Sequence, residues 1–597
     1  MIANDILNWY EASLPSQERK RRGHFSTPPL LVEQLLDACG YRPENDLSRL
    51  RVLDPACGSG NLLAGALHRL IASGKQAGHS EEEIAASVQR NLWGFDPDPI
   101  ACFLAEMQLR VVLSTEQHPA PQQSIQEMRL QVAENELLRL PAAPLAKVPL
   151  HIHQADGLAL AWEQRETVDL LLANPPYLAA KNNDLSGYRS AQQRGQADSY
   201  LLFLNLALQV VRPNGWIGLI LPDPVLARVN ATKERQHLLA KTTVHHLWHL
   251  SGVFSAYVGA AIIIAQKNPP RKQHQISWKR ERWQSSPTTA TEKVSSTKKA
   301  YEHSVLLSNS PKSVAQAHLH QQPGAELRYL LSEVQETLVG RLQACLHQAD
   351  MHNEPGRLVP LRDLVTIRRG EELSKNSPLL NQSGGSNETE WYPVLRGGVD
   401  MRPYGVPVAR CWIAREQIMK PLEPYLAPKL LVVKSTGHLQ AALDLQGHVV
   451  LQTLYLLNLR APYTPVRADS LQQTQNEDEL YFLLALLNSR LLREYVYVLY
   501  TAYKWLQPQI EQHVLACLPI PMIESSEKES IVKRAKLLMS ACSEVAPVVE
   551  LQTQRNDVYE EQERAICTLY ESALEQRGRQ HTASSMQLTD KGVAFYG

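Results

Sequence analysis

The chain has 597 residues, of which 44% are hydrophobic and 20% are charged. This composition is typical of a globular protein rather than a disordered one. The length exceeds that of one ordinary hydrophobic core, so two or three domains are expected. The 61 basic and 61 acidic side chains give a formal net charge of zero, which argues against a histone-like protein but allows a local basic cleft that faces nucleic acid.

Three further classes are disfavoured by the sequence. No apolar run approaches the roughly 18 residues that a membrane helix needs. The N-terminal segment carries its charges after its apolar part and has no cleavage site of small residues, so a signal peptide is not expected. The eight cysteines form no Cys-x-x-Cys pair, which disfavours a zinc or redox site. We expect a cytoplasmic protein that requires no metal.

The first half of the chain has the pattern of an α/β domain. Residues 1–22 are predicted to form an amphipathic helix. Residues 23–284 alternate short apolar runs with helical patterns, and the runs occupy 51–56, 92–96, 151–156, 168–176, 215–222, 246–251 and 260–267. Continuous apolar strands that are each followed by a helix indicate a mostly parallel, doubly wound sheet covered on both faces.

The second half is less regular. Residues 285–356 are predicted to be a linker followed by a connecting helix, because Lys, Gln, Ser, Thr and Pro dominate where the segment begins. Residues 357–522 combine short strands, Gly and Pro turns and a strong helix around 479–500, which predicts an α+β domain. The helical periodicity over 526–578 predicts a helical C-terminal tail, 523–597.

The strongest local motif is a turn of small residues after the first apolar run. It reads Asp54-Pro55-Ala56-Cys57-Gly58-Ser59-Gly60. Gly58 and Gly60 permit a positive φ and a close approach of the backbone to a ligand, and the helix that follows offers unpaired N–H groups. The pattern matches the Gly-x-Gly-x-x-Gly dinucleotide motif only loosely. A carboxylate at the strand end suits a cationic amino-acid ligand better than a pyrophosphate. The plainer alternative is an ordinary strand–turn–helix connection.

Two other apolar runs end in an acid. Asp96 closes the second run, where a carboxylate can hydrogen-bond both hydroxyls of an adenosine ribose. Asp156, followed by Gly157, comes after the third run and could accept a hydrogen bond from an adenine amino group. An isolated Asp at a strand end is more often a helix cap, so both interpretations depend on the first motif.

The fourth run ends in Asn174-Pro175-Pro176-Tyr177. Two prolines prevent ladder pairing and fix the turn, so the carbonyls there stay available as acceptors. Asn174 offers a side-chain carbonyl and Pro175 a main-chain one. Two acceptors that converge on an amino group draw its nitrogen lone pair out of conjugation with a ring, which makes the nitrogen nucleophilic. Tyr177 supplies a flat face for a base.

In this order and spacing, the motifs resemble those of the γ-class adenine-N6 DNA methyltransferases of type II restriction–modification systems. The resemblance implies a Rossmann-like methyltransferase domain, S-adenosyl-L-methionine as cofactor and duplex DNA as partner. It identifies Gly23-His24-Phe25-Ser26-Thr27-Pro28-Pro29 as an N-terminal motif that covers the methionine part of the cofactor. It assigns cofactor binding to Thr27 of this motif and to Asp54, Pro55, Ala56, Cys57, Gly58, Gly60, Asp96, Asp156, Gly157 and Asn174. It assigns catalysis to Asn174, Pro175, Pro176, Tyr177 and Phe254, the last as the ring that stacks on a flipped base.

The resemblance continues over 357–522, which is similar to a target-recognition domain. The candidate DNA contacts there are Arg362, Arg368, Arg369, Arg396, Lys434 and Arg490. About a third of such a set is expected to touch phosphate, and fewer to read bases. The pair Arg368-Arg369 before a glycine is favoured. The C-terminal helices could dock companion restriction or defence proteins, or could simply pack on this domain.

Other functions stay open. A C5-cytosine enzyme is excluded, because it needs a thiol nucleophile directly after a proline and the chain has no Pro-Cys dipeptide. Amino-methyltransferases that act on RNA or protein share the Asn-Pro-Pro-Tyr motif. A DNA-binding subunit with a vestigial methyltransferase fold is the alternative from a different class.

Overall fold

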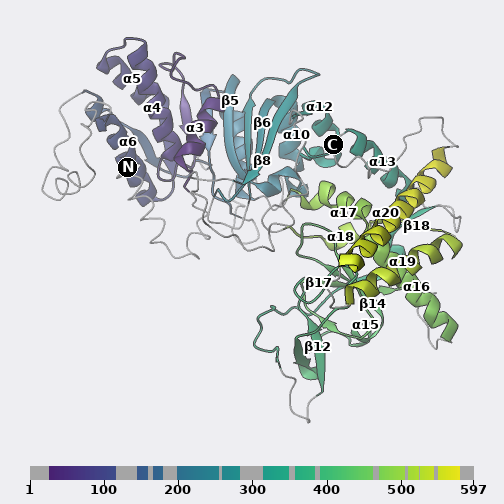
Figure 1. Cartoon of the computed structure of the whole chain (residues 1–597). Helices are drawn as coiled ribbons and strands as arrows, with labels where there is room; N and C mark the ends of the chain where they lie inside the picture. Colours follow the sequence, from purple (N-terminus) through teal and green to yellow (C-terminus); the bar gives the residue numbers. More distant parts are fainter. Residues whose placement is uncertain are drawn as a thin grey trace. The chain divides into compact units, whose positions relative to one another are not determined.

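A computed structural model of the chain describes residues 26–115, 144–158, 166–178, 198–253, 259–282, 313–331, 333–347, 357–382, 390–460, 470–503, 508–523, 525–543 and 549–578. The helix predicted over 1–22 lies outside these residues. The chain forms two compact units, Met1–Tyr329 and Leu330–Gly597 (Figure 1). No helix of the described residues is long and apolar enough to cross a membrane.

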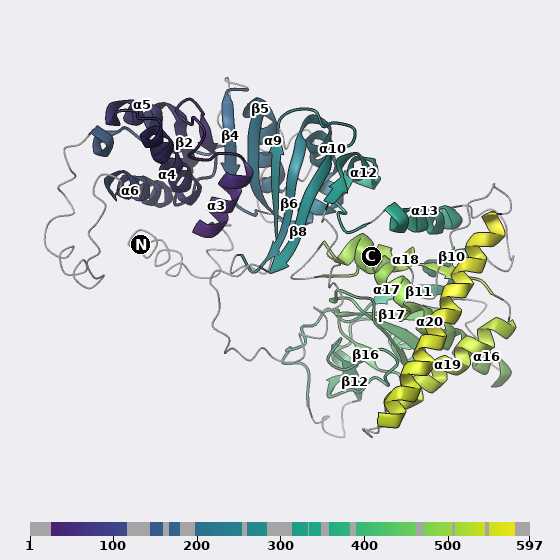
Figure 2. The same cartoon turned by 45° about the horizontal axis from the view of Figure 1, so that its top comes forward.

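The first unit is built around one large sheet. Its described strands are β1 (Val52–Asp54), β2 (Leu92–Asp96), β3 (His151–Gln154), β4 (Val168–Ala173), β5 (Val211–Pro222), β6 (Thr243–Ser251), β7 (Ala260–Gln266), β8 (Gln275–Arg282) and β9 (Ser313–Ala315). The helices are α3 (Pro29–Ala38), α4 (Asn61–Gln76), α5 (Glu81–Asn91), α6 (Pro99–Thr115), α9 (Ser199–Val210), α10 (Thr232–Lys241) and α12 (Gln316–Gln321). Figure 2 shows α4, α5 and α6 gathered near β2.

The strand order is β3-β2-β1-β4-β5-β7-β6-β8-β9. The first five strands in this order pair in parallel, whereas β7 is antiparallel to both of its neighbours. The apolar run of β4 has five of its six residues buried, as expected for a strand covered on both faces. The predicted mostly parallel α/β sheet is confirmed.

One boundary was predicted wrongly. Residues 313–329 were assigned to the linker 285–356, but β9 pairs with β8 in the sheet, and α12 packs beside α10 (Figure 1). Polar anchors explain the difference. The buried amide of Gln316 donates to the carbonyls of Leu239 and Thr242 and accepts from the N–H of Val244.

Arg235 is the second anchor of this segment. Its side chain is fully buried on α10 and donates to the carbonyls of Gly324 and Ala325. A buried guanidinium requires such acceptors, because an unpaired one loses its hydration without compensation. The segment 313–329 therefore belongs to the folded unit. Its Gln- and His-rich composition alone would assign it to a linker.

The second unit contains three small sheets and a set of helices. Its described strands are β10 (Leu358–Pro360), β11 (Val365–Arg369), β12 (Trp391–Leu395), β13 (Cys411–Ala414), β14 (Lys429–Val433), β15 (Ala441–Asp444), β16 (Val449–Val450), β17 (Leu454–Leu459) and β18 (Pro519–Pro521). The helices are α13 (Glu333–His347), α14 (Leu361–Leu364), α15 (Glu423–Leu426), α16 (Ser470–Leu487), α17 (Arg490–Val496), α18 (Gln512–Ala516), α19 (Ser525–Ser543) and α20 (Val549–Gly578), and a π-helical turn follows α17 at Tyr497–Thr501.

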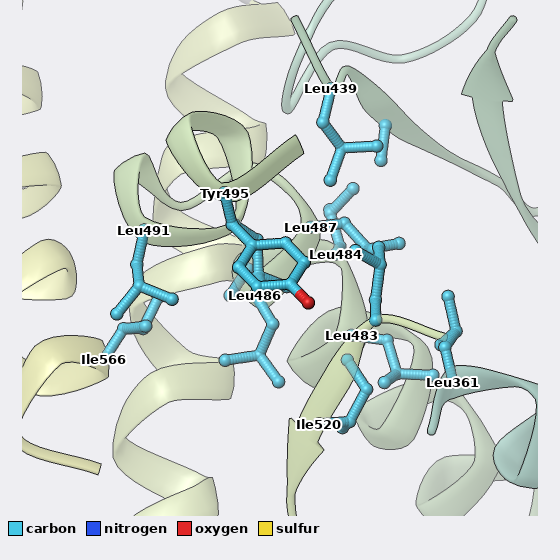
Figure 3. Packing of buried hydrophobic residues seen from close by; sticks show 14 of the residues in the cluster. Leu361, Leu439, Leu483, Leu484, Leu486, Leu487, Leu491, Tyr495, Ile520 and Ile566 are labelled. Atoms are coloured by element: carbon cyan, nitrogen blue, oxygen red, sulfur yellow. The ribbon is translucent and has the colours of Figure 1, made fainter. Parts of the chain in front are cut away.

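In the four-stranded sheet β11-β17-β14-β15, strands β14, β15 and β17 are buried along their whole length, whereas β11 is partly exposed. Along β14, Leu430 and Val432 join one hydrophobic cluster, whereas Leu431 and Val433 join another. Side chains of a strand alternate between its two faces. Because both faces of β14 are covered, its successive residues 430–433 must be apolar. Figure 3 shows the cluster on the helical side, where Leu491 of α17 lies against Ile566 of α20.

The C-terminal helices are part of this core. Residues 523–597 were predicted to be a tail, with packing on the recognition domain as one of two options. The structure shows that option: Ile531, Leu538 and Ile566 are buried in the same cluster as residues of α16. Helix α19 packs against α16, and α20 packs against α19 (Figure 2). Tyr570 donates to the carbonyl of Pro519 at 2.6 Å. The domain therefore extends through α20.

A buried ion pair joins β14 to β15. The Nζ atom of Lys429 lies 2.6 Å from Oδ2 of Asp444, and both side chains are fully buried. His448 Nδ1 lies 2.9 Å from the other carboxylate oxygen. Burial lowers the pKa of Lys429, whereas these hydrogen bonds and charges hold the pKa of Asp444 below its ordinary value despite burial.

We predict that Asp444→Asn destabilises the second unit by about 3–5 kcal/mol, because it leaves the ammonium of Lys429 buried without a counter-charge. Urea unfolding, with hydrogen exchange in β14 as a local reporter, measures the loss. Lys536→Met is the control, since it removes an exposed pair with Asp478 and should cost at most about 1 kcal/mol. Equal losses for the two variants would contradict the assignment.

Candidate functional site

Five neighbouring strands place a polar residue at the same sheet edge. Asp54 and Asp96 end β1 and β2, Asp156 follows β3, Asn174 follows β4 and Asp223 follows β5. These strands are adjacent and parallel, so their carboxyl ends coincide. This edge is where open α/β sheets bind ligands.

The small-residue turn after β1 has the predicted conformation. Gly58 and Gly60 adopt φ values of 51° and 88°, which favour glycine, and Gly60 caps α4. The N–H of Gly58 donates to Oδ2 of Asp96 at 3.0 Å, and the N–H of Cys57 donates to the carbonyl of Phe95 at 2.9 Å. The turn is thus tied to the end of β2, and its buried thiol has a raised pKa because of burial.

Asp54 is a buried carboxylate with a single described donor. The N–H of Ala56 donates to its Oδ1 at 3.1 Å, and the residue is 1% exposed. Burial, with the nearby charge of Asp96, raises its pKa to about 8. A cation placed beside it would restore its charge.

Asp156 and Gly157 lie close to the small-residue turn that follows β1. A Cβ atom on Gly157 would lie 2.1 Å from the carbonyl oxygen of Pro55, so only glycine allows the two loops to approach this closely. Oδ1 of Asp156 accepts from the N–H of Leu158 at 2.9 Å.

Asn174 is linked to the N-terminal motif. Its Nδ2 donates to Oγ1 of Thr27 at 3.2 Å, and its Oδ1 accepts from the hydroxyl of Tyr177 at 3.4 Å. Asn61, at the start of α4, donates to Ser26 and to the carbonyl of Thr27 at 2.7 and 2.8 Å. Three predicted motifs therefore share one hydrogen-bond network, and Asn61 is the member to which we had assigned no role.

The carbonyls of the two prolines differ in their hydrogen bonds. Among the described residues, none donates a hydrogen bond to the carbonyl of Pro175. The carbonyl of Pro176, by contrast, accepts from Ser199 Oγ, which itself accepts from the N–H of Leu178 at 3.0 Å. Ser199 begins α9 and holds the loop in place. Tyr177 packs against the core of the unit.

A second network was not expected from the sequence. Asp223 is buried, and its Oδ2 lies 3.6 Å from Nε2 of the fully buried His249. Nδ1 of His249 lies 2.6 Å from the hydroxyl of Tyr329. Burial lowers the pKa of His249, and burial together with the charge of Asp223 raises the pKa of Tyr177. Asp223 thus lies near the Asn-Pro-Pro-Tyr loop.

Two parts of the predicted site lie outside the described residues. These are Phe254 and residues 23–25 of the N-terminal motif. Their predicted roles stay predictions.

In the second unit, three predicted DNA contacts gather around Gln452 and Thr453, just before β17. Arg369 donates to Oε1 of Gln452 at 2.9 Å, Thr453 Oγ1 donates to the carbonyl of Arg396 at 3.1 Å, and the N–H of Lys434 donates to the carbonyl of Thr453 at 2.9 Å. Burial and the charge of Arg369 lower the pKa of Lys434.

The other predicted DNA contacts differ in how far their side chains are exposed or engaged by neighbouring residues. Arg368 is exposed on β11. Two side-chain nitrogens of Arg396 bind the buried carboxylate of Asp400, and Arg490 pairs with Glu560 of α20. Arg362 is exposed, and its Nη1 donates to Cys517 Sγ at 3.2 Å. The guanidinium groups of Arg396 and Arg490 therefore hold the fold of the unit.

Comparison with known proteins finds a matching family model in each of the two units. Residues 90–254 match the model of the Eco57I restriction-modification methylase, and residues 392–520 match the TaqI-like C-terminal specificity domain. The chain is thus similar to a restriction–modification methylase over one region and to a specificity domain over another. The predicted resemblance to type II methyltransferases with a C-terminal recognition domain is confirmed.

Individual relatives are distant. The type II methyltransferase M.VspI of Vibrio sp. (strain 343) is 23% identical over 268 residues, which are 44% of this chain and 53% of that protein. M.BstVI of Geobacillus stearothermophilus is 25% identical over 217 residues, 34% of each chain. The chain thus spans about half the length, or less, of these curated relatives.

One solved structure is similar over most of the chain. It is titled as the type IIL restriction-modification enzyme MmeI in complex with DNA, and it matches with a TM-score of 0.55 and 11% identity. The match covers 94% of this chain and 78% of that one. At this identity, the likeness concerns the fold.

We predict that Gly157→Ala displaces the turn at Asp54–Gly58 and costs about 1–3 kcal/mol of stability, because the added Cβ meets backbone atoms that cannot rotate away. Thermal unfolding and hydrogen exchange at the turn measure the effect. Gly340→Ala, on α13 with open space around the new Cβ, should be neutral or stabilising. If both variants behave alike, the close approach does not constrain the site.

Proposed function

We propose that the chain transfers a methyl group from S-adenosyl-L-methionine to the N6 amino group of adenine in duplex DNA, at a sequence chosen by the second unit. The observation that carries this proposal is the network that joins Asn174, Thr27 and Asn61. It brings the acceptor side chain of the Asn-Pro-Pro-Tyr loop to the edge where the acidic strand ends lie.

The residues at this edge fit the cofactor. The buried carboxylate of Asp54 suits the ammonium of an amino-acid moiety, because a cation there relieves the raised pKa. Asp96 accepts backbone N–H groups from Gly58 and Asp98, and it lies at the end of β2, where a carboxylate can bind the hydroxyls of an adenosine ribose. S-adenosyl-L-methionine, when bound, supplies an electrophilic methyl group on a sulfonium.

The acceptors fit the amine. In the structure, Asn174 Nδ2 donates to Thr27 Oγ1, and Oδ1 faces the loop, where the Tyr177 hydroxyl donates to it over a long 3.4 Å. The two N–H groups of an adenine amine would bind this oxygen and the carbonyl of Pro175. These two acceptors would make the amine nitrogen more nucleophilic toward the methyl group that the cofactor would supply, and the proton lost from the methylated amine would pass to solvent.

Access to the amine requires that the adenine leave the helix, since a paired and stacked amine cannot reach the sheet edge. We place the flipped base against Tyr177, with Phe254 as the second ring. Aromatic stacking returns about 1–3 kcal/mol per base, which offsets part of the few kcal/mol needed for flipping.

The second unit supplies the DNA contacts in this proposal. Arg369 and Lys434 lie close enough to lower the pKa of the lysine, and a phosphate between them would relieve that repulsion. Arg368, which directly precedes Arg369 in the sequence, is exposed. Arg396 is proposed to position the loop at Thr453, with fewer free donors for DNA. Companion restriction or defence proteins stay a prediction.

The direct test of the function is single-molecule sequencing of genomic DNA from cells that express the chain. Adenine methylation within one short motif is expected. Unmodified genomic DNA together with methylated RNA or protein would favour the alternative substrates.

We predict that Asn174→Ala lowers the methyl-transfer rate by about 10²–10³-fold, the effect of removing one preorganised polar group. Asn174→Asp keeps the acceptor and should retain more activity. Asp96→Ala should instead weaken cofactor binding by about 1–3 kcal/mol. Transfer rates and cofactor titrations of the three variants separate these roles. Equal loss of cofactor affinity in Asn174→Ala and Asp96→Ala would mean that Asn174 is misassigned.

We also predict that cofactor affinity depends on pH through Asp54. Its pKa is about 8 without ligand, and an ammonium partner favours its charged form, so binding releases a proton. Affinity for S-adenosylhomocysteine should therefore rise with pH by up to about tenfold per unit and level off above about pH 8. Asp54→Asn should abolish this slope. A slope that persists in the variant refutes the assignment.

A further inference from the structure

The first unit has a pocket at the edge of its sheet opposite to the candidate site. The pocket measures about 560 Å³ and lies where β1, β2 and β3 begin. Arg51 directly precedes β1, Trp93 is the second residue of β2 and His151 is the first residue of β3. Parallel pairing brings them together, since Trp93 is in register with His151 and Leu92 with Val52. In Figure 2, the place is found where α5 leads into β2.

The pocket is strongly basic. Arg49, Arg51 and Arg90 line it, the other polar lining groups are hydroxyl, amide and imidazole, and no carboxylate is among them. Within the part of the chain that the structure describes, none of the three guanidinium groups has a carboxylate at ion-pair distance. Asp46 and Asp169, the acids nearby in sequence and register, accept the backbone N–H groups of Ser48 and Arg51. Hydrogen bonds from Ser48 lower the pKa of Asp46, and the charge of Arg49 adds a smaller contribution.

An isolated surface arginine is usually only solvated, but three in one concave pocket repel one another. The carboxyl end of α5 points here and carries about half a negative charge, which offsets less than one arginine. Arg49 and Arg51 are outside that helix. A ligand with two or more negative charges would remove the remaining repulsion.

The walls of the pocket are held by hydrogen bonds. Asn91 Nδ2 donates to the carbonyl of Ser48 at 2.7 Å, and Trp93 Nε1 donates to the carbonyl of Arg90 at 2.9 Å. The rings of Trp93 and His151 are parallel, with centroids 3.9 Å apart and an angle of 3° between planes. Burial and the neighbouring His153 lower the pKa of His151, so near neutral pH the ring pair is an uncharged aromatic wall.

We propose that this pocket binds a small phosphate-bearing ligand of the nucleotide class. The arginines would hold the phosphates, because guanidinium forks bind phosphate oxygens in pairs. The Trp93–His151 pair would lie beside the base. The volume is within the range of ordinary small-ligand sites. This inference goes beyond methyl transfer, since the pocket lies at the edge of the sheet away from Asp54 and Asn174.

Calorimetric titration of the full chain with CDP and with inorganic pyrophosphate tests the proposal. CDP avoids competition at an adenosine-binding site. The wild type should bind both, and Arg51→Gln/Arg90→Gln should weaken both by at least about tenfold, a loss of about 1.4 kcal/mol. Trp93→Leu should weaken CDP more than pyrophosphate. Thermal unfolding verifies that each variant is folded.

Arg42→Gln is the matched control, because Arg42 is an exposed arginine of the same unit that lies near Asp37 instead. Its affinities should stay within about twofold of the wild type. The proposal is overturned if the wild type binds neither probe at millimolar concentration, or if Arg42→Gln weakens binding as much as the double variant. It is also overturned if the double variant loses affinity for a DNA duplex but not for CDP, since the arginines would then contact a nucleic-acid backbone.

Discussion

The parallel pairing of β3, β2, β1, β4 and β5 is the constraint on which the candidate site depends. Because these strands run in one direction, every strand end that carries an Asp or Asn reaches the same edge. The close contact of Gly157 with Pro55 then draws two of the loops together, and the bonds of Asn61 and Asn174 add the N-terminal motif. The packing also affects charge: burial, together with the nearby charge of Asp96, raises the pKa of Asp54, and a cationic ligand beside this carboxylate would lower it again.

The two units use buried polar groups in different ways. In the first unit, Gln316 and Arg235 hydrogen-bond a segment, 313–329, to the sheet domain, although composition alone assigns that segment to a linker. In the second unit, the ion pair of Lys429 and Asp444 joins two strands whose other side chains are apolar. Such groups specify one arrangement of the chain, because any other leaves a buried charge or amide unpaired. The pocket of Arg49, Arg51 and Arg90 contrasts with both, because its charges have no such described partners.

Much of the first unit could be predicted from local patterns. The apolar runs that end in Asp54, Asp96 and Asn174 predicted three strands of the sheet and the edge at which these strands end. This is possible because a buried parallel strand is apolar throughout, so the first polar residue marks its end. Asp223 and His249 could not be recognised in this way, since their network depends on Tyr329, a residue distant in sequence. The packing of α19 and α20 could not be predicted from local patterns either. A helical periodicity predicts that a helix forms, but it does not predict which surface the helix packs against.

The identity of the methylated nucleoside tests the account most directly. Duplex DNA would be incubated with the chain and with S-adenosylmethionine that carries an isotopically labelled methyl group, and then digested to nucleosides for mass spectrometry. The account predicts the label in N6-methyldeoxyadenosine, because the Asn174 and Pro175 acceptors are arranged for an exocyclic amine. Label in N4-methyldeoxycytidine would contradict the choice of adenine. DNA without label, under conditions in which RNA or protein becomes labelled, would contradict the central claim.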